Sequence, residues 1–254
     1  MKDCDCYSFK LINQTDDPIL KNVDLAIVLT MENSSRKFDD SVLLNLAPLT
    51  YFQINKGFKK CNKPGVTNST EDVKHAFKNV CKNTTSYNNV IIFEDDAIFN
   101  YKYSIDEFKN IDDFISKEKF DIYSLGSVSF DIPNFSNHKL MITPVGACHA
   151  VIYSQSARSN LIYIDGYHFD NDIISSLQHK YKYKYPLICQ TFPNTPAKSE
   201  WANIPKNVLL SRYMDFTGAE YNIEPFWGSI YVICDWCIYG VILIIILVII
   251  KSFN

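Results

Sequence analysis

The sequence predicts an α/β fold, a mixed and mainly parallel sheet with flanking helices, followed by a C-terminal transmembrane helix. Short continuous apolar runs, typical of strands buried on both faces, alternate with amphipathic stretches of helical spacing. Strands that alternate with helices indicate a sheet of parallel character. From Gly228 to Ile250 the chain is apolar for 23 residues apart from Asp235, and about 20 residues span a bilayer as a helix.

The first half of the chain shows the clearest elements. Residues 25–29 form a short apolar run, as expected of a buried strand. Residues 69–82 begin with Ser69 and two acids as an N-cap signal, and apolar residues then follow at helical spacing, which predicts a helix. Residues 90–93 form a second buried strand. The later elements are expected to be a helix over 104–117, strands over 120–125 and 149–154, helices over 156–162 and 171–179, and a strand over 186–190.

The apolar C-terminal stretch divides the chain into a body and an anchor. The alternative is a buried core helix, because the uninterrupted part after Asp235 is only 15 residues long. Without residues 228–254 the chain retains 227 residues, enough for one domain with a substantial core. The expected divisions are an extension (1–22), a main domain (23–200), a subdomain or linker (201–227), a transmembrane helix (228–250) and a tail (251–254).

Composition excludes several functions. The 8 glycines are scattered, so the chain has no G-x-G-x-x-G turn and no P-loop, and a phosphate group must be held in another way. The net charge is -3 and only three of the 25 basic residues are arginine, which argues against a nucleic acid partner. Residues 179–185 alternate basic and aromatic side chains as single-strand binders do, but this alternation is more typical of a two-faced edge strand or a helix end.

The N-terminus and the cysteines bear on the compartment of the body. The first residues contain no apolar core of a signal peptide, so we expect the body to face the cytosol. The only C-x-x-C pair, Cys234 and Cys237, lies in the expected span, so neither a zinc site nor a disulfide scaffold is expected. We interpret the N-glycosylation sequons as coincidences of an Asn-rich chain that would matter only in a lumenal body. They begin at Asn13, Asn33, Asn68 and Asn83.

Three carboxylates, Glu94, Asp95 and Asp96, follow the strand over 90–93 directly. In an open α/β sheet the carboxyl ends of the strands form the edge where ligands bind. Three neighbouring negative charges repel one another unless a cation neutralises them, and carboxylate oxygens suit Mg²⁺ or Mn²⁺, which would in turn bind a diphosphate. The alternative is a helix N-terminus or a solvated turn.

A second acidic pair, Asp170 and Asp172, precedes an expected helix. Its simplest interpretation is a helix N-cap, although an enzyme that transfers a group to a hydroxyl needs a carboxylate to accept the proton. His149 opens a strand. It either contacts a phosphate or, as is more frequent, is buried and paired with backbone.

Polar residues also follow the first strand. Thr30 and Asn33 come after it, and Arg36 lies just beyond. Their side chains and backbone could hold the base and ribose of a nucleotide. Alternatively, Thr30 ends the strand and Asn33 or Ser34 caps the next helix.

Segments over about residues 23–200 resemble, in the right order, the family 25 glycosyltransferases, the lipopolysaccharide and collagen galactosyltransferase group. The most specific is Ile91–Phe99, which is similar to the family's apolar strand followed by E-D-D-a-x-F. The Asn-, Lys- and Ile-rich pattern also resembles divergent sugar transferases of large DNA viruses. The weaker matches are 25–29 with Arg36, the helix over 69–81, Cys148–Ser154, Phe169–Ile173 (x-D-x-x-[LI]) and Tyr185–Gln190 (Y-P-x-x-x-Q).

The resemblance implies a GT-A fold, a nucleotide-diphosphate sugar donor with a UDP-sugar as first candidate, Mn²⁺ or Mg²⁺, and inversion at the anomeric carbon. The acceptor would be a glycan, a protein or a lipid. The alternatives are a non-catalytic anchored protein with a degenerate transferase fold and a metal-dependent phosphohydrolase. The expected roles are metal binding by Glu94 and Asp96, donor binding by Thr30, Asn33, Arg36, Asp95 and His149, and proton acceptance by Asp170 or, failing that, Asp172.

Overall fold

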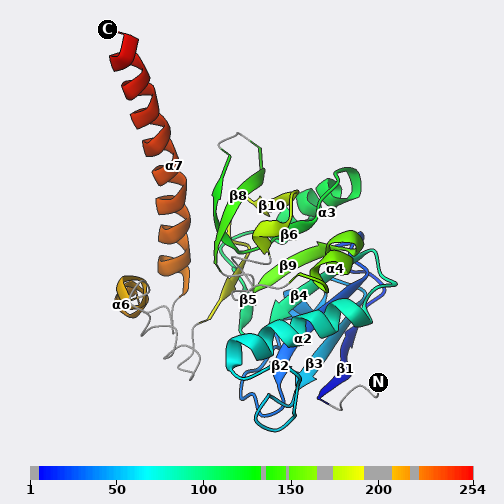
Figure 1. Ribbon diagram of the computed structural model, residues 1–254. Coiled ribbons are helices and arrows are strands. Elements are labelled where there is room, and N and C mark those ends of the chain that lie inside the picture. Colours follow the sequence, from blue (N-terminus) through cyan, green and yellow to red (C-terminus); the bar gives the residue numbers. More distant parts are fainter. Residues whose placement is uncertain are drawn as a thin grey trace.

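The computed structural model describes residues 6–132, 136–146, 149–164, 174–191, 208–217 and 223–253. Its body is built around a mixed sheet, and a long helix extends from it (Figure 1). Among the described residues the sheet has nine strands in the order β1-β3-β2-β4-β9-β6-β10-β8-β7. The α/β class and the apolar C-terminal helix predicted from the sequence are confirmed.

The elements follow one another along the chain with short connections. The strands are β1 (Tyr7–Gln14), β2 (Leu25–Met31), β3 (Leu49–Asn55), β4 (Asn89–Glu94), β5 (Ala97–Phe99), β6 (Ile122–Ser124), β7 (Val128–Asp131), β8 (His138–Gly146), β9 (Ala150–Ser154), β10 (Lys180–Tyr183) and β11 (Ile188–Gln190). The helices are α1 (Ser41–Leu44), α2 (Ser69–Asn83), α3 (Glu107–Lys117), α4 (Gln155–Leu161), the 3-10 turn η2 (Ile174–Ser176), α6 (Val208–Thr217) and α7 (Ile223–Phe253).

The strands that pair in parallel all end at one edge of the sheet. β2 pairs in parallel with β3 and β4, and β6 pairs in parallel with β10, whereas the other described pairs are antiparallel. β4 and β6 both run antiparallel to β9, which lies between them, so they point the same way. The ends of β2, β3, β4, β6 and β10 therefore share one edge, called the carboxyl edge below.

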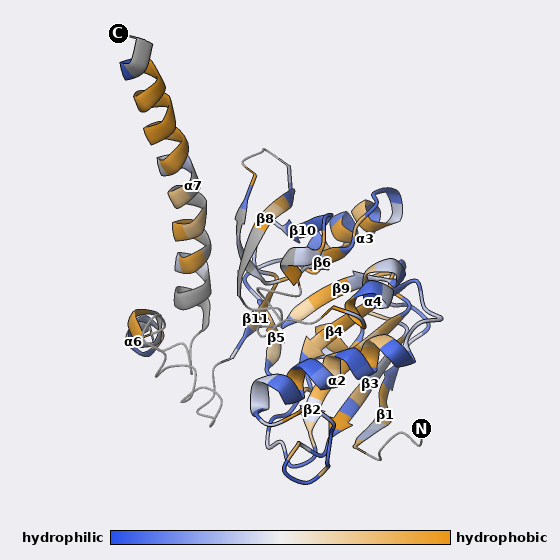
Figure 2. Ribbon diagram, viewed as in Figure 1, coloured by the Kyte–Doolittle hydropathy of each residue, from blue (hydrophilic) through white to orange (hydrophobic). Residues whose placement is uncertain are grey.

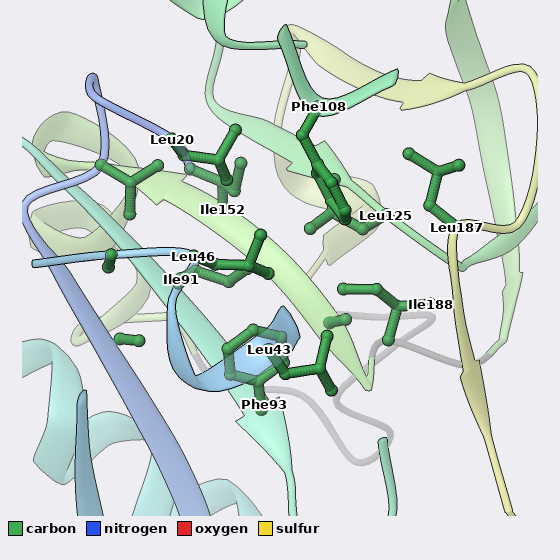
Figure 3. Close-up of a cluster of buried hydrophobic side chains, with 14 of the residues drawn as sticks. Leu20, Leu43, Leu46, Ile91, Phe93, Phe108, Leu125, Ile152, Leu187 and Ile188 are labelled. Carbon is green, nitrogen blue, oxygen red and sulfur yellow. The ribbon is translucent and has the colours of Figure 1, made fainter. Parts of the chain in front are cut away.

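The central strands are apolar throughout because both faces of the sheet are covered. In β4, Ile91 and Phe93 belong to one buried cluster, which also contains side chains of α1 and α3 (Figure 3). Val90 and Ile92 belong to a second cluster, with side chains of α2 and α4. Alternate residues of a strand point to opposite faces, so a strand buried on both sides needs a continuous apolar run.

Two predicted helices are confirmed with small shifts at their starts. α2 begins at Ser69, but its N-cap is the preceding residue, Asn68, whose Oδ1 accepts from the N–H of Glu71 at 2.9 Å. α3 begins at Glu107 instead of Ser104, three residues later than expected. In both cases a polar side chain ahead of the helix made the boundary ambiguous in the sequence.

The helix expected over residues 171–179 is replaced, in its described part, by the short turn η2. The backbone N–H groups of Gln178 and His179 donate to the carboxylate of Asp121 at 3.0 and 2.9 Å, and this leads the chain into β10. β10 lies between β6 and β8, so the alternating stretch predicted as an edge strand or a helix end is an interior strand. Residues 171–173 lie outside the described residues.

α7 is apolar on all sides, as the colouring of Figure 2 shows. Its segment Gly228–Lys251 is long and apolar enough to cross a membrane. The alternative of a buried core helix does not fit, because large side chains along it are exposed, with Trp236 at 70% and Ile245 at 52%. A helix that is apolar all round and not covered by protein is typical of a membrane span.

The first 22 residues, expected as an extension, contribute the edge strand β1, which pairs with β3. A disulfide joins Cys6, directly before β1, to Cys61 in the loop after β3. The prediction that the chain has no disulfide is therefore wrong. The two cysteines are 55 residues apart and follow no spacing rule, and only the pairing of Tyr7 with Asn55 brings them together.

Arg158 in α4 is fully buried and holds the turn after α2 against the end of β9. Its guanidinium donates to the backbone carbonyls of Thr84 at 3.2 Å, Asn88 at 3.4 Å, Tyr87 at 2.5 Å and Tyr153. Burial lowers the pKa of Arg158 to about 10, so it stays charged at neutral pH. Five donors in a planar fork suit this set of carbonyls better than any other side chain does.

Replacing Arg158 with Met should lower the free energy of unfolding by about 3 kcal/mol or more, because several buried carbonyls lose their donor at about 1–3 kcal/mol each. Arg158→Lys should restore only part of the loss, since an ammonium reaches fewer carbonyls. The measurement is thermal or urea unfolding of the full chain in detergent. Arg212→Met, at an exposed position of α6, is the control and should change stability by no more than about 0.5 kcal/mol. Equal stability of the two variants would contradict this account.

Candidate functional site

The acidic triplet lies at the carboxyl edge, as predicted. Glu94 is the last residue of β4, and Asp95 and Asp96 form the tight turn into β5. β5 pairs with β11 in a separate two-stranded sheet, in which Gln190 lies opposite Ala97. This pairing brings the end of β11 next to the turn, although the two are far apart in the sequence.

Asp95 connects this turn to the loop that follows β2. Its Oδ2 accepts from the hydroxyl groups of Thr30 and Ser34, each at 2.7 Å. Its Oδ1 accepts from the guanidinium of Arg36 at 2.5 Å. Asp95 is only 8% exposed, and a carboxylate so deeply buried needs partners of this kind to stay charged. The two segments are thus fixed to each other through a single carboxylate.

Arg36 lies between two of the acids. Its Nη1 is 2.5 Å from Oδ1 of Asp95 and 3.3 Å from Oδ2 of Asp96. Burial by itself lowers the pKa of Arg36, but the negative charges of Asp96 and Asp95 outweigh it and raise the pKa. The cation that the clustered carboxylates require is therefore supplied in part by the chain itself.

Glu94 and Asp96 converge on the side-chain amide of Gln190. Nε2 of Gln190 donates to Oε2 of Glu94 at 2.8 Å and lies 3.3 and 3.4 Å from the two carboxylate oxygens of Asp96. The N–H of Thr191 donates to the backbone carbonyl of Asp96 at 3.0 Å and fixes the turn. Burial raises the pKa of Asp96 to about 6 in spite of Arg36, so its negative charge is incompletely compensated.

The donor atoms of Glu94 and Asp96 fit Mn²⁺ or Mg²⁺ in kind, because both ions prefer carboxylate oxygens. In the part of the chain that the structure describes, no group of three or more His, Cys, Asp or Glu is arranged to hold a metal. Mg²⁺ commonly binds through one or two carboxylates together with water and substrate phosphates. The pair therefore fits an ion that arrives with a diphosphate and is not a complete protein site.

His149 is fully buried at the start of β9. Its Nε2 is 2.9 Å from the carbonyl oxygen of Ile188, and its own carbonyl accepts from the N–H of Glu94 at 2.9 Å. A Cβ at Gly126 would lie 1.9 Å from that Ile188 oxygen and 2.5 Å from the histidine Nε2, so only glycine fits there. The geometry matches the alternative of a core histidine bonded to backbone, which here supports β4 and β11 beside the site.

The loop after β2 differs from the helix cap that the sequence left open. α1 begins only at Ser41, and its cap is Asp40, whose side chain accepts from two backbone N–H groups. Neither Asn33 nor Ser34 caps this helix. Ser34 instead binds Asp95, and Asn33 is exposed on the same loop.

The structure brings Thr30, Arg36 and Asp95 into contact, as the sequence predicted for a shared site. Asp170 and Asp172 lie outside the described residues. Sequence reasoning missed two contributors. Ser34 was considered only as a cap and Gln190 only as part of a strand motif. Polar side chains at strand ends of one sheet edge were the signal that could have identified both.

Comparisons with known proteins identify no family for this chain. No protein-family model matches the sequence, and no curated protein matches it. Among solved structures, the crystal structure of A197 from STIV is similar with a TM-score of 0.39 and 11% sequence identity, covering 63% of this chain and 81% of that chain. A likeness this distant supports no argument about fold or function.

Replacing Asp95 with Asn should lower the free energy of unfolding by about 3 kcal/mol, because hydrogen bonds to a charged group contribute about 1.5–3 kcal/mol each and Arg36 loses its nearest partner. Thr30→Val, which removes one of these bonds, should cost less. Thermal unfolding of the full chain in detergent measures both. Asp39→Asn changes an exposed acid of the same loop and should be nearly neutral. A variant at Asp95 as stable as this control would show that the carboxylate does not fasten the two segments together.

Proposed function

We propose that this protein is a membrane-anchored, metal-dependent glycosyltransferase with a GT-A-type body, which moves a sugar from a nucleotide-diphosphate donor to an acceptor hydroxyl with inversion. The observation that carries the proposal is the convergence of Glu94 and Asp96 on one amide at the carboxyl edge, beside the ion-paired Arg36. Ligands of open α/β sheets bind at this edge. A UDP-sugar is the first donor to test.

The charge of the site suits a diphosphate only together with a cation. Three carboxylates face one guanidinium, so the described site is negative before any phosphate arrives. Glu94 and Asp96 would hold Mn²⁺ or Mg²⁺. When bound, such an ion supplies Lewis-acid stabilisation of the charge that develops on the departing diphosphate. The scattered glycines fit this arrangement, since no glycine-rich backbone cradle is needed.

The residues around the acids have separate tasks in this proposal. Asp95 acts as a positioning residue, because its oxygens already accept from Thr30, Ser34 and Arg36. Arg36 is held at the edge, where it can contact a diphosphate oxygen. Asn33 is exposed on the same loop and is available to the base or ribose of the donor. His149 supports the strands from inside and leaves the donor to these residues.

The acceptor step needs a base, and we assign it to Asp170, with Asp172 as the alternative. The acceptor oxygen attacks the anomeric carbon as the bond from that carbon to the diphosphate oxygen breaks, and the base takes the hydroxyl proton. Both residues lie in the segment between α4 and η2. The anchor α7 would keep the site near a membrane, within reach of lipid-linked, protein or glycan acceptors.

Asp96→Ala should lower metal-dependent hydrolysis of the nucleotide sugar by about 100-fold or more, because a site with one remaining carboxylate loses several kcal/mol of charge stabilisation. Glu94→Gln should act in the same direction. The measurement is nucleotide release from a panel of nucleotide sugars with Mn²⁺. Glu32→Gln, an exposed acid paired with Lys60, is the matched control and should keep full activity.

Undiminished metal-dependent turnover by Asp96→Ala would rule out the metal assignment. Wild-type protein without turnover on any nucleotide sugar would favour a non-catalytic anchored protein. Release of inorganic phosphate without any sugar transfer would favour a phosphohydrolase. Sugar transfer that survives in Asp170→Asn would move the base to Asp172.

A further inference from the structure

The disulfide between Cys6 and Cys61 places the two ends of one interaction across the edge of the sheet. The Cα atoms are 5.6 Å apart, within the usual range for a disulfide. The N–H of Lys56 donates to the carbonyl of Cys6 at 3.1 Å, and Tyr7 pairs with Asn55, so the backbone already holds this junction in place. The bridge therefore belongs to the native fold, in which Cys6 is 1% exposed.

The other cysteines of the described body complete this pattern. Cys81 and Cys189 are thiols in the interior, with exposures of 0% and 1%. Burial raises the pKa of Cys81 to about 12, so it stays protonated and unreactive. Within the described body, the partly exposed cysteine, Cys61, is the one that is bridged. Such a distribution suits a compartment in which accessible thiols are oxidised.

We propose that the body lies on the oxidising, lumenal or extracellular side of the membrane and that Asn83 is an N-glycosylation site there. The inference does not depend on the proposed function. It differs from the cytosol-facing orientation expected from the sequence. α7 would then cross the membrane with Lys251 on the cytosolic side, where positive residues next to a span are favoured.

The four sequons differ in what the fold leaves accessible. The amide of Asn13 donates to the carbonyl of Leu44 at 2.8 Å and to Asn45 at 3.2 Å, and Asn68 is the N-cap of α2. A glycan at either residue would disturb a structural contact. Asn33 is exposed, but it lies on the loop that forms the candidate site.

Asn83 has none of these constraints. It is the exposed last residue of α2, and the turn that follows contains Thr85, the exposed hydroxyl residue of the sequon. Its amide bonds only within its own helix in the described contacts, to Asn79 at 2.8 Å. α2 connects the end of β3 to the start of β4, so Asn83 lies at the edge opposite Glu94. A glycan there leaves the candidate site open.

The two covalent steps use reagents of that compartment. The thiols of Cys6 and Cys61 give two electrons and two protons to a disulfide oxidant, which becomes a dithiol. At Asn83 the amide nitrogen forms a bond to the anomeric carbon of a lipid-diphosphate-linked oligosaccharide. The bond from that carbon to the diphosphate oxygen breaks, the lipid diphosphate leaves with the electron pair, and the amide releases one proton.

The test is expression of the full chain in cells whose secretory pathway attaches N-glycans, followed by digestion with an amide-cleaving glycosidase and electrophoresis. Wild type should increase in mobility on digestion, and Asn83→Gln should lack one glycan. Thr85→Ala, which keeps Asn83 but breaks the sequon, should give the same loss. Asn79→Gln lies one turn earlier on the same helix, outside any sequon, and should match wild type.

Wild-type protein unaffected by the glycosidase, or glycans retained in full by Asn83→Gln, would overturn the assignment. The side of the membrane is tested separately by alkylating denatured, unreduced chain. Cys6 and Cys61 should resist modification in wild type, and Cys6→Ser should expose Cys61. Full modification of both residues in the unreduced wild type would overturn the oxidising location.

Discussion

The candidate site depends on one buried carboxylate. Asp95 accepts from Thr30, Ser34 and Arg36, and through them it fixes the loop after β2 to the turn after β4. A charge with so little exposure is stable only when its hydrogen-bonding capacity is filled, so the position of Arg36 follows from the need to compensate Asp95. The remaining acids, Glu94 and Asp96, are then presented on either side of a turn that cannot relax.

The second support of the site is long-range strand pairing. β5 is only three residues long, yet its pairing with β11 brings Gln190 between Glu94 and Asp96. His149 and Gly126 pack beneath this pairing, where the absence of a Cβ allows the Ile188 carbonyl to approach. The convergence of the two outer carboxylates is thus a property of the tertiary structure and not of the E-D-D sequence alone.

The sequence predicted what is local and missed what is not. The buried strand before Glu94 and the helix over 69–82 were clear, because burial on two faces and an amphipathic stripe leave direct periodic signals. The roles of Ser34 and Gln190, and the bridge from Cys6, depend on which strands become neighbours, which a single sequence does not encode in any short pattern. The helix expected before β10 failed for the same reason, since a distant carboxylate, Asp121, bonds its backbone.

The central claim, that Glu94 and Asp96 form a cation-dependent diphosphate site, is tested most directly by ligand-induced stabilisation. Full-length protein is unfolded thermally with a UDP-sugar, with Mn²⁺, with both, and with neither. A ligand at about 100 times its dissociation constant stabilises the native state by about 2.7 kcal/mol. The account predicts a stabilisation of this size with both ligands together, little with the nucleotide sugar alone, and none in Asp96→Ala. Stabilisation of the wild type and Asp96→Ala to the same extent, or by the nucleotide sugar without the metal, would contradict it.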